Sequence, residues 1–191
     1  LNDGEELGAR EALQALLEIA DVQPNFLRKN LVPVGEAMLT IAGTEDLDAS
    51  TRQLGLEFLV TLAERSGGMM RKQMHLMKEA IPMAVTFICD VEEDEEWASR
   101  EEPEGAFGDA QEGDELSAFG EQAIDRLSVA LGGKAVMPVT TAIIEELLNN
   151  KDDWKQRRAA FQTLALMGEG CAKHLKPQIA AVVGMVLPSF E

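Results

Sequence analysis

Three kinds of residue recur in a fixed order four times along this chain. Each copy has a small residue, a large apolar residue directly after it, and a second large residue three places later. A proline follows in or near the first turns of the next helical stretch. The four sets are Ala12, Leu13, Leu16 and Pro33; Gly55, Leu56, Leu59 and Pro82; Ala123, Ile124, Leu127 and Pro138; and Ala160, Phe161, Leu164 and Pro177. This recurrence predicts a tandem repeat of helical hairpins.

The spacing of the copies supports a particular repeat type. Leu13, Leu56, Ile124 and Phe161 are separated by 43, 68 and 37 residues, and removing an insertion of about 25 residues brings the middle value to about 43. A period of roughly 40–47 residues is typical of HEAT-type hairpins. Because one hairpin cannot cover its own apolar face, each is stabilised by its neighbours and the array grows as a superhelix.

Apolar residues at spacings of three and four predict eight helices and no strand. The expected helices cover about residues 5–21, 27–42, 50–67, 69–91, 116–131, 134–148, 154–167 and 174–187. The alternative for this pattern is an eight-helix bundle whose apolar stripes align by chance. The joint recurrence of small residue, large residue and proline favours the all-α, HEAT-repeat superhelix of about four hairpins.

Local signals predict where several helices begin and end. Ser50 to Gln53 has the spacing of a capping box, and Asp153 is an N-cap candidate. Gly67-Gly68 and Gly132-Gly133 are expected helix stops.

One acidic segment, residues 92–115, interrupts the array. It holds twelve carboxylates against the single cation Arg100, a net of −11 out of the chain's −17. With few apolar groups and strong self-repulsion, it is expected to form a long loop that a cationic partner orders. The predicted organisation is two hairpins in residues 1–91, the acidic loop in 92–115 and two hairpins in 116–191, all part of a longer solenoid.

Specific residues of this loop are candidates for partner binding. The aromatic side chain of Trp97 lies within the carboxylate run and could anchor the loop on the array or on a partner. Second-helix carboxylates Glu145 and Glu146 are weaker candidates, since a solvated helix surface explains them equally well. The first group of candidates consists of Glu92, Glu93, Asp94, Glu95, Glu96 and Trp97.

Catalytic, metal and cofactor motifs are not found in the sequence. Residues 131–135 (LGGKA) lack both the first glycine and the Ser/Thr of a phosphate-binding loop. The two histidines, His75 and His174, have no Cys, Asp or Ser at catalytic or zinc-ligand spacing. The acidic run lacks the alternating order of an EF-hand. Cys171 is interpreted as a buried small residue, and we expect no enzyme activity and no cofactor.

Composition restricts the partners and the compartment. A pI near 4.5 argues against direct nucleic-acid binding and favours basic partners. The sequence contains no run of eighteen apolar residues, so we expect no membrane-spanning helix. Two cysteines far apart, with no CxxC motif, fit a reducing cytosolic or nuclear compartment.

Several segments resemble the importin-beta superfamily of karyopherins. The resemblance covers essentially the whole chain and is weakest at residues 100–115. The segments are DVEEDEEWA at 90–98, AIDRL at 123–127, LGGK at 131–134, RQL at 52–54, EFLVTL at 57–62, MRK at 70–72, DWK at 153–155 and GEGC at 168–171.

This resemblance implies a nuclear import receptor built of HEAT repeats that shuttles between cytoplasm and nucleus. Its implied partners are basic cargo proteins, Ran-GTP and Phe-Gly nucleoporins, and the acidic loop is implied in contacts with Ran and cargo. The alternative function is a HEAT-type scaffold subunit in which the acidic loop is a solubilising spacer. Nucleotide-dependent binding of Ran distinguishes the two.

Overall fold

The computed structural model describes residues 3–91 and 115–190, and every regular element in these two ranges is helical. The predicted all-α class is therefore confirmed. The elements are α1 (Asp3–Val22), η1 (Pro24–Lys29), α2 (Leu31–Gly43), α3 (Ala49–Met70), α4 (Met74–Cys89), α5 (Glu115–Leu131), α6 (Gly133–Asn149), α7 (Trp154–Leu166), α8 (Gly168–Leu175), η3 (Lys176–Gln178), α9 (Ile179–Val186) and η4 (Leu187–Phe190), where η denotes a 3₁₀ helix.

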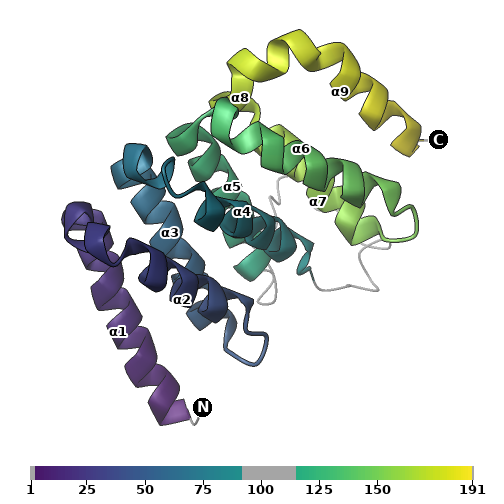
Figure 1. Ribbon diagram of the computed structural model, residues 1–191. Coiled ribbons are helices and arrows are strands. Elements are labelled where there is room, and N and C mark those ends of the chain that lie inside the picture. Colours follow the sequence, from purple (N-terminus) through teal and green to yellow (C-terminus); the bar gives the residue numbers. More distant parts are fainter. Residues whose placement is uncertain (1–2, 92–114, 191) are drawn as a thin grey trace, which may run out of the picture.

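The helices form two layers that follow the chain from one end of the molecule to the other (Figure 1). The first helices of the hairpins, α1, α3, α5 and α7, pack in sequence, and so do the second helices α2, α4, α6 and α8. Each second helix also packs against the first helix of the next hairpin. The arrangement is an open row of HEAT-type hairpins, as predicted, and the closed bundle alternative is wrong.

Burial of the recurring positions depends on their place in the row. In the inner hairpins Leu56, Leu59 and Leu127 are fully or almost fully buried. The equivalent Leu16 and Leu164 in the terminal hairpins are only partly buried. An inner hairpin has a neighbour on both sides, whereas a terminal hairpin has one.

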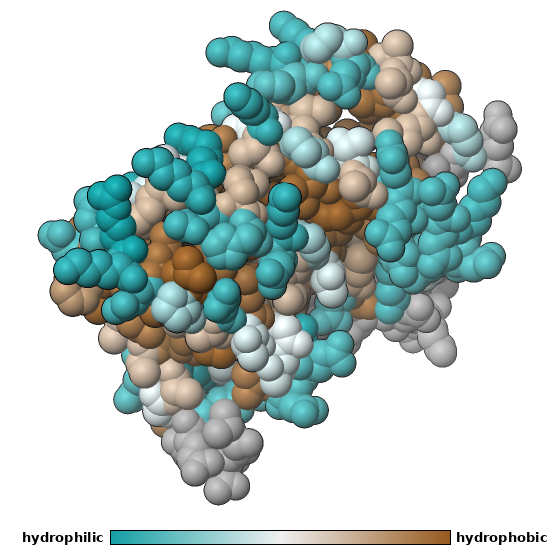
Figure 2. Space-filling model, viewed as in Figure 1, coloured by the Kyte–Doolittle hydropathy of each residue, from teal (hydrophilic) through white to brown (hydrophobic). Residues whose placement is uncertain are grey.

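The two ends of the row expose large apolar side chains. Leu7 in α1 is 58% exposed, and Ile179 and Leu187 near the C-terminal end are 60% and 58% exposed. Figure 2 shows apolar side chains over the C-terminal arm that contains α9. At each end of the row the hairpin packs against a neighbouring hairpin on one side only.

Two glycines allow successive hairpins to approach closely. A Cβ atom on Gly55 of α3 would lie 2.7 Å from the carbonyl oxygen of Met38 in α2. A Cβ on Gly120 of α5 would lie 2.6 Å from the carbonyl oxygen of Ala84 in α4. Both contacts are with backbone, which cannot rotate away as a side chain can. Gly55, a small residue of the repeat, and Gly120, three positions before Ala123 of the next copy, therefore set the distance between neighbouring hairpins.

The second helix of the first hairpin starts later than predicted. Residues 24–29 form a 3₁₀ turn, so α2 begins at Leu31 rather than near Leu27. Pro24 stands at the start of this turn, where its missing N–H removes no helical hydrogen bond.

The predicted capping box at Ser50 is wrong. α3 begins at Ala49, and its N-terminal groups are bound from the neighbouring hairpin. Glu6 Oε1 of α1 accepts hydrogen bonds from the Asp48 backbone N–H at 3.0 Å and the Thr51 hydroxyl at 2.8 Å. These two hydrogen bonds lower the pKa of the Glu6 carboxyl.

Of the other helix ends predicted from local signals, some agree with the structure and one does not. Gly132, with φ of 79°, ends α5 as predicted, because this backbone conformation is open to glycine and strained for other residues. The stop at Gly67-Gly68 is wrong, since α3 continues to Met70 after a kink at Ser66. The N-cap at Asp153 is confirmed, because its Oδ1 accepts from the Gln156 backbone N–H at 3.1 Å.

The fourth hairpin departs most from the prediction. Its second helix begins at Gly168 rather than near His174, and the turn at Lys176–Gln178 divides it into α8 and α9. Pro177 lies in this turn and cannot donate the hydrogen bond that a continuous helix needs.

We expect Gly120→Ala to lower the free energy of unfolding by about 1–3 kcal/mol, because the added methyl group forces α4 and α5 apart. Urea denaturation followed by circular dichroism measures the change. Gly8→Ala in exposed α1 is the matched control, since no atom lies within 4 Å of its Cβ position. That change should be neutral or stabilise by up to about 1 kcal/mol. Equal stability of the two variants would contradict the close-approach argument.

Candidate functional site

The main predicted binding residues fall within 92–114, outside the described residues. The structure therefore places none of this group, which consists of Glu92, Glu93, Asp94, Glu95, Glu96 and Trp97. The chain is described on both sides of this segment, at the end of α4 and the start of α5.

Cations of α7 hold the residues from which the acidic segment begins. Lys155 Nζ donates a hydrogen bond to the carbonyl oxygen of Val91 at 2.7 Å. Arg158 Nη1 donates to the carbonyl oxygen of Ile88, near the end of α4, at 3.2 Å. The carbonyl end of a helix carries partial negative charge, so cations are favourable there. The last described residues before the segment are thus bound to the fourth hairpin.

The start of α5 is tied to the same group. Ser117 Oγ donates to the Ile88 carbonyl oxygen at 3.2 Å. Glu121 Oε1 accepts from Arg158 Nη2 at 3.1 Å and from Gln162 Nε2 at 2.5 Å. We call Ile88, Val91, Ser117, Glu121, Lys155 and Arg158 the loop stem. It joins the second, third and fourth hairpins at the point where the acidic segment leaves the array.

The thiols of both cysteines have a raised pKa. Burial raises the pKa of the half-buried Cys89, nearby Asp153 and Asp90 raise it further, and Arg158 opposes them. Burial also raises the pKa of Cys171, which has no exposed surface. Because the thiolate is the reactive form, neither position favours nucleophilic chemistry. The interpretation of Cys171 as a buried small residue is confirmed.

Glu145 and Glu146 lie near the end of α6, and both side chains are exposed. Glu145 lines a cavity of about 550 Å³ together with Arg157 of α7 and Met185 of α9. The guanidinium of Arg157 donates to the carbonyl oxygen of Lys151. The ends of α2, α4 and α6 lie along one edge of the row (Figure 1), so these carboxylates share an edge with the loop stem.

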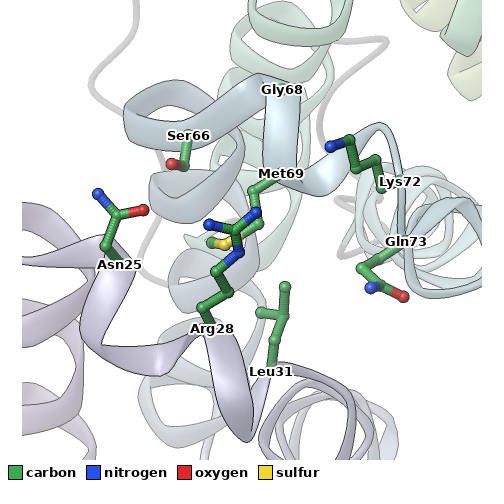
Figure 3. Close-up of a pocket in the computed structure, with 8 residues that line it drawn as sticks. All are labelled: Asn25, Arg28, Leu31, Ser66, Gly68, Met69, Lys72 and Gln73. Atoms are coloured by element: carbon green, nitrogen blue, oxygen red, sulfur yellow. The ribbon is translucent and has the colours of Figure 1, made fainter.

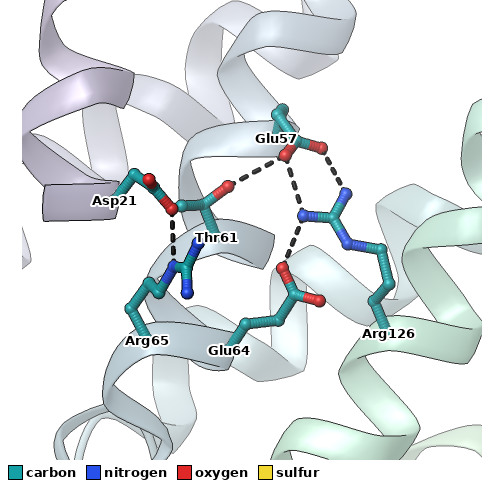
Figure 4. A network of polar contacts seen from close by, with 6 residues as sticks. All are labelled: Asp21, Glu57, Thr61, Glu64, Arg65 and Arg126. Carbon is teal, nitrogen blue, oxygen red and sulfur yellow. Dashed lines mark hydrogen bonds and ion pairs between the residues drawn. The ribbon is translucent and has the colours of Figure 1, made fainter.

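An ionic cluster on the first-helix layer joins the second and third hairpins (Figure 4). Arg126 of α5 binds Glu57 of α3 through two parallel contacts of 2.6 and 2.8 Å, and its Nη2 also contacts Glu64 at 2.6 Å. The Thr61 hydroxyl donates to Glu57 Oε1 at 2.8 Å. These carboxylates raise the pKa of Arg126, so its charge is permanent.

This cluster lines a shallow cavity between α1, α3 and α5 with a volume of about 490 Å³. Arg65 closes another side by pairing with Asp21 of α1 at 2.5 Å. Sequence reasoning missed the pairing of Glu57 with Arg126, because the two lie 69 positions apart and no local pattern links them. The cluster holds the row together across its first-helix layer.

Within 3–91 and 115–190, no group of three or more His, Cys, Asp or Glu side chains is arranged to hold a metal ion. None of the helices in these ranges combines the length and apolarity needed to cross a bilayer.

Residues 44–138 match a protein-family model described as an importin repeat. Importin subunit beta-3 of Saccharomyces cerevisiae is 22% identical over 190 residues, which is 98% of this chain and 17% of that protein. A probable importin-5 homolog of Dictyostelium discoideum is 24% identical over 186 residues, 96% of this chain and 16% of that protein. The chain thus spans only about a sixth of the length of these relatives.

Solved structures of the karyopherin Kap121p share the fold. Kap121p bound to Pho4p superposes with a TM-score of 0.88 at 21% identity. Kap121p bound to RanGTP gives a TM-score of 0.86 at 21% identity. Both superpositions cover 98% of this chain and 18% of Kap121p. The predicted HEAT-type superhelix is confirmed by this likeness.

We expect Arg126→Met to lower the free energy of unfolding by about 1–2 kcal/mol, because Glu57 and Glu64 would face each other without their shared cation. Arg65→Met is the matched control, since the Arg65 and Asp21 side chains are 56% and 44% exposed. An exposed pair contributes little, at most about 1 kcal/mol and commonly near zero. Thermal and urea unfolding of both variants measure the difference. An equal loss in the two would show that the cluster is not a specific join between hairpins.

Proposed function

We propose that this chain, which resembles the importin-beta superfamily in sequence and fold, is a segment of a nuclear transport receptor. Such a receptor binds basic cargo proteins, Ran-GTP and Phe-Gly nucleoporins and shuttles between cytoplasm and nucleus. The observation that carries the proposal is the match of residues 44–138 to the importin repeat. The four hairpins would be consecutive units of a longer solenoid.

The partners proposed here are consistent with those of similar proteins. Kap121p has been crystallised bound to RanGTP, to Nup53p and to Pho4p, and each of these structures resembles this chain over 98% of its length. The same fold supports binding by surface contact, without a catalytic group. We therefore propose that the chain acts as a binding protein and not as an enzyme.

Within this function, the acidic segment attracts cations of the partner. Its twelve carboxylates create a negative field that draws in a basic cargo signal or a basic surface of Ran. Glu92, Glu93, Asp94, Glu95 and Glu96 come directly after Val91, which Lys155 holds at 2.7 Å. These five would therefore act close to the array, with Trp97 as the apolar anchor of the contact.

Glu145 and Glu146 are proposed as a second contact for the same partner. They are exposed at the end of α6, on the edge where the acidic segment leaves the array (Figure 1). A basic segment bound to residues 92–96 could continue along this edge toward α6. Both carboxylates would then pair with its Lys or Arg side chains.

A HEAT-type scaffold subunit is the alternative function. In a scaffold the acidic segment would only keep the array soluble, and no partner would distinguish the two nucleotide states of Ran. Binding of Ran-GTP in preference to Ran-GDP therefore separates the two functions.

Replacing the five carboxylates at positions 92–96 by Gln and Asn in the full-length protein should weaken binding of a basic cargo peptide or Ran-GTP. We expect a loss of about tenfold or more at low salt and a smaller loss at physiological salt, because ionic screening shortens the attraction. Isothermal titration calorimetry with Ran loaded with GTP or GDP measures both affinities.

The matched control removes five carboxylates from the distal part of the same segment: Glu101, Glu102, Glu104, Asp109 and Glu112. It changes net charge by the same amount but leaves residues 92–96 intact. The specific role of 92–96 predicts a clearly smaller loss in this control. Unchanged affinity for both ligands in the first variant would refute the assignment of the loop, and no preference for Ran-GTP would favour the scaffold.

A further inference from the structure

The two long edges of the row carry opposite charge. The connections within hairpins lie along one edge, and the connections between hairpins lie along the other (Figure 1). The between-hairpin edge contains the acidic residues Glu45, Asp46 and Asp48, and the acidic segment follows α4 and precedes α5 in the sequence. At the within-hairpin edge, each of the first three connections lies in a stretch that contains no Asp or Glu. These stretches are residues 22–35, 65–78 and 126–144.

The first two of these stretches meet at a cavity of about 550 Å³ (Figure 3). Arg28 rises from η1, and Lys72 extends from the turn between α3 and α4 toward the same space beside Met69. The polar side chains of Asn25, Ser66 and Gln73 also line it. No carboxylate is among the lining residues, so all charge in the cavity wall is positive.

These two cations have no anionic partner among the described residues. Arg65, Arg126 and Arg158 each pair with a carboxylate, whereas no ion pair within residues 3–91 and 115–190 involves Arg28 or Lys72. Two like charges that face one cavity repel each other, and an anion placed between them would be attracted to both. Arg28 supplies a planar fork and Lys72 a mobile point charge for that anion.

We propose that this cavity, the Arg28–Lys72 site, binds an acidic peptide segment of a partner protein. One carboxylate or phosphate group would lie between the two cations, and the amides of Asn25 and Gln73 and the hydroxyl of Ser66 would donate further hydrogen bonds. The same connection exposes Phe26, which is 78% exposed and suits an apolar residue of a peptide rather than a free anion. The site recognises the charge opposite to that of the proposed basic cargo.

A peptide fits this site better than a nucleic acid. Nucleic-acid affinity comes from many phosphate contacts along a continuous basic surface. Here the cavity wall supplies two cations, Arg28 and Lys72, while the whole chain has a net charge of −17. That net charge repels a long polyanion, which would lie along much of the surface. A short acidic segment contacts only this edge and is repelled less.

The test measures binding of fluorescein-labelled peptides to the full chain by fluorescence anisotropy. One peptide is rich in Glu around a central Leu, a second has phosphoserine in place of the Glu residues, and a third has Gln. Inorganic phosphate serves as a competitor and a single-stranded oligonucleotide as a further probe. We expect the Glu or the phosphoserine peptide to bind and the Gln peptide not to bind, and the tighter of the two anionic peptides identifies the anion.

Charge reversal of the two cations, Arg28→Glu with Lys72→Glu, should weaken peptide binding by at least about tenfold, because both charge-assisted hydrogen bonds are lost. The matched control is Lys29→Glu with Lys134→Glu, which makes the same charge change on the same edge without touching the cavity lining. We expect less than about a threefold loss there. All four side chains are exposed, so unfolding is not expected, and circular dichroism verifies this.

Three results would overturn the proposal. An equal loss in the control pair would mean that the edge attracts anions only through its diffuse charge. Equal binding of the Gln peptide would show that charge is not recognised. Binding of the oligonucleotide without binding of either acidic peptide would assign the cavity to nucleic acid. None of these outcomes depends on Ran, so failure here is distinguishable from failure of the transport function.

Discussion

The structure depends on one constraint, which is that no hairpin can bury its apolar face without a neighbour. Leu56, Leu59 and Leu127 are buried because helices of adjacent hairpins cover them, and burial of such a side chain contributes about 1.5–3 kcal/mol. This covering requires backbones to come close, which the glycines at positions 55 and 120 permit. The ionic cluster at Arg126 and the capping of α3 by Glu6 then fix the same neighbours in register. Hydrophobic packing selects the neighbour, and the polar contacts define how it is oriented.

Periodicity along the chain was sufficient to predict the architecture, because each repeat carries its small and large residues at the same sequence spacing. The helix ends were less predictable. The prediction of a capping box at Ser50 failed because Glu6, a carboxylate of another hairpin, accepts the hydrogen bonds at the start of α3. The local sequence around Ser50 does not indicate this long-range contact. The stop at Gly67-Gly68 failed because α3 kinks at Ser66 and continues. The predictions at Gly132 and Asp153 were confirmed because the backbone conformation and the N-cap hydrogen bond involve only neighbouring residues of the same segment.

The candidate site shows the same division between local and long-range information. The acidity of residues 92–115 is evident from composition, and so is the exposure expected for Glu145 and Glu146. The loop stem is not evident from composition, because Lys155 and Arg158 bind backbone carbonyl oxygens at the end of α4 that are 64 and 70 positions away in the sequence. The Arg28–Lys72 site is equally hidden, since its two cations come from different hairpins and only the packing of η1 beside the α3–α4 turn brings them together. Sequence composition identified the charged groups, and the solenoid determined which of them meet.

Opposite charges can coexist on this molecule because the solenoid keeps them apart. A first helix runs from one edge of the row to the other, and a helix of 17 residues such as α5 is about 25 Å long at 1.5 Å per residue. At physiological ionic strength charges are screened over about 8 Å, so each edge presents its own field to an approaching partner. The proposed basic segment would therefore be attracted at the between-hairpin edge with little effect from the cations of the opposite edge. An acidic segment can reach Arg28 and Lys72 despite the net negative charge of the chain. The length of the helices, set by the repeat, is thus what would allow one small array to hold the two proposed partners of opposite charge.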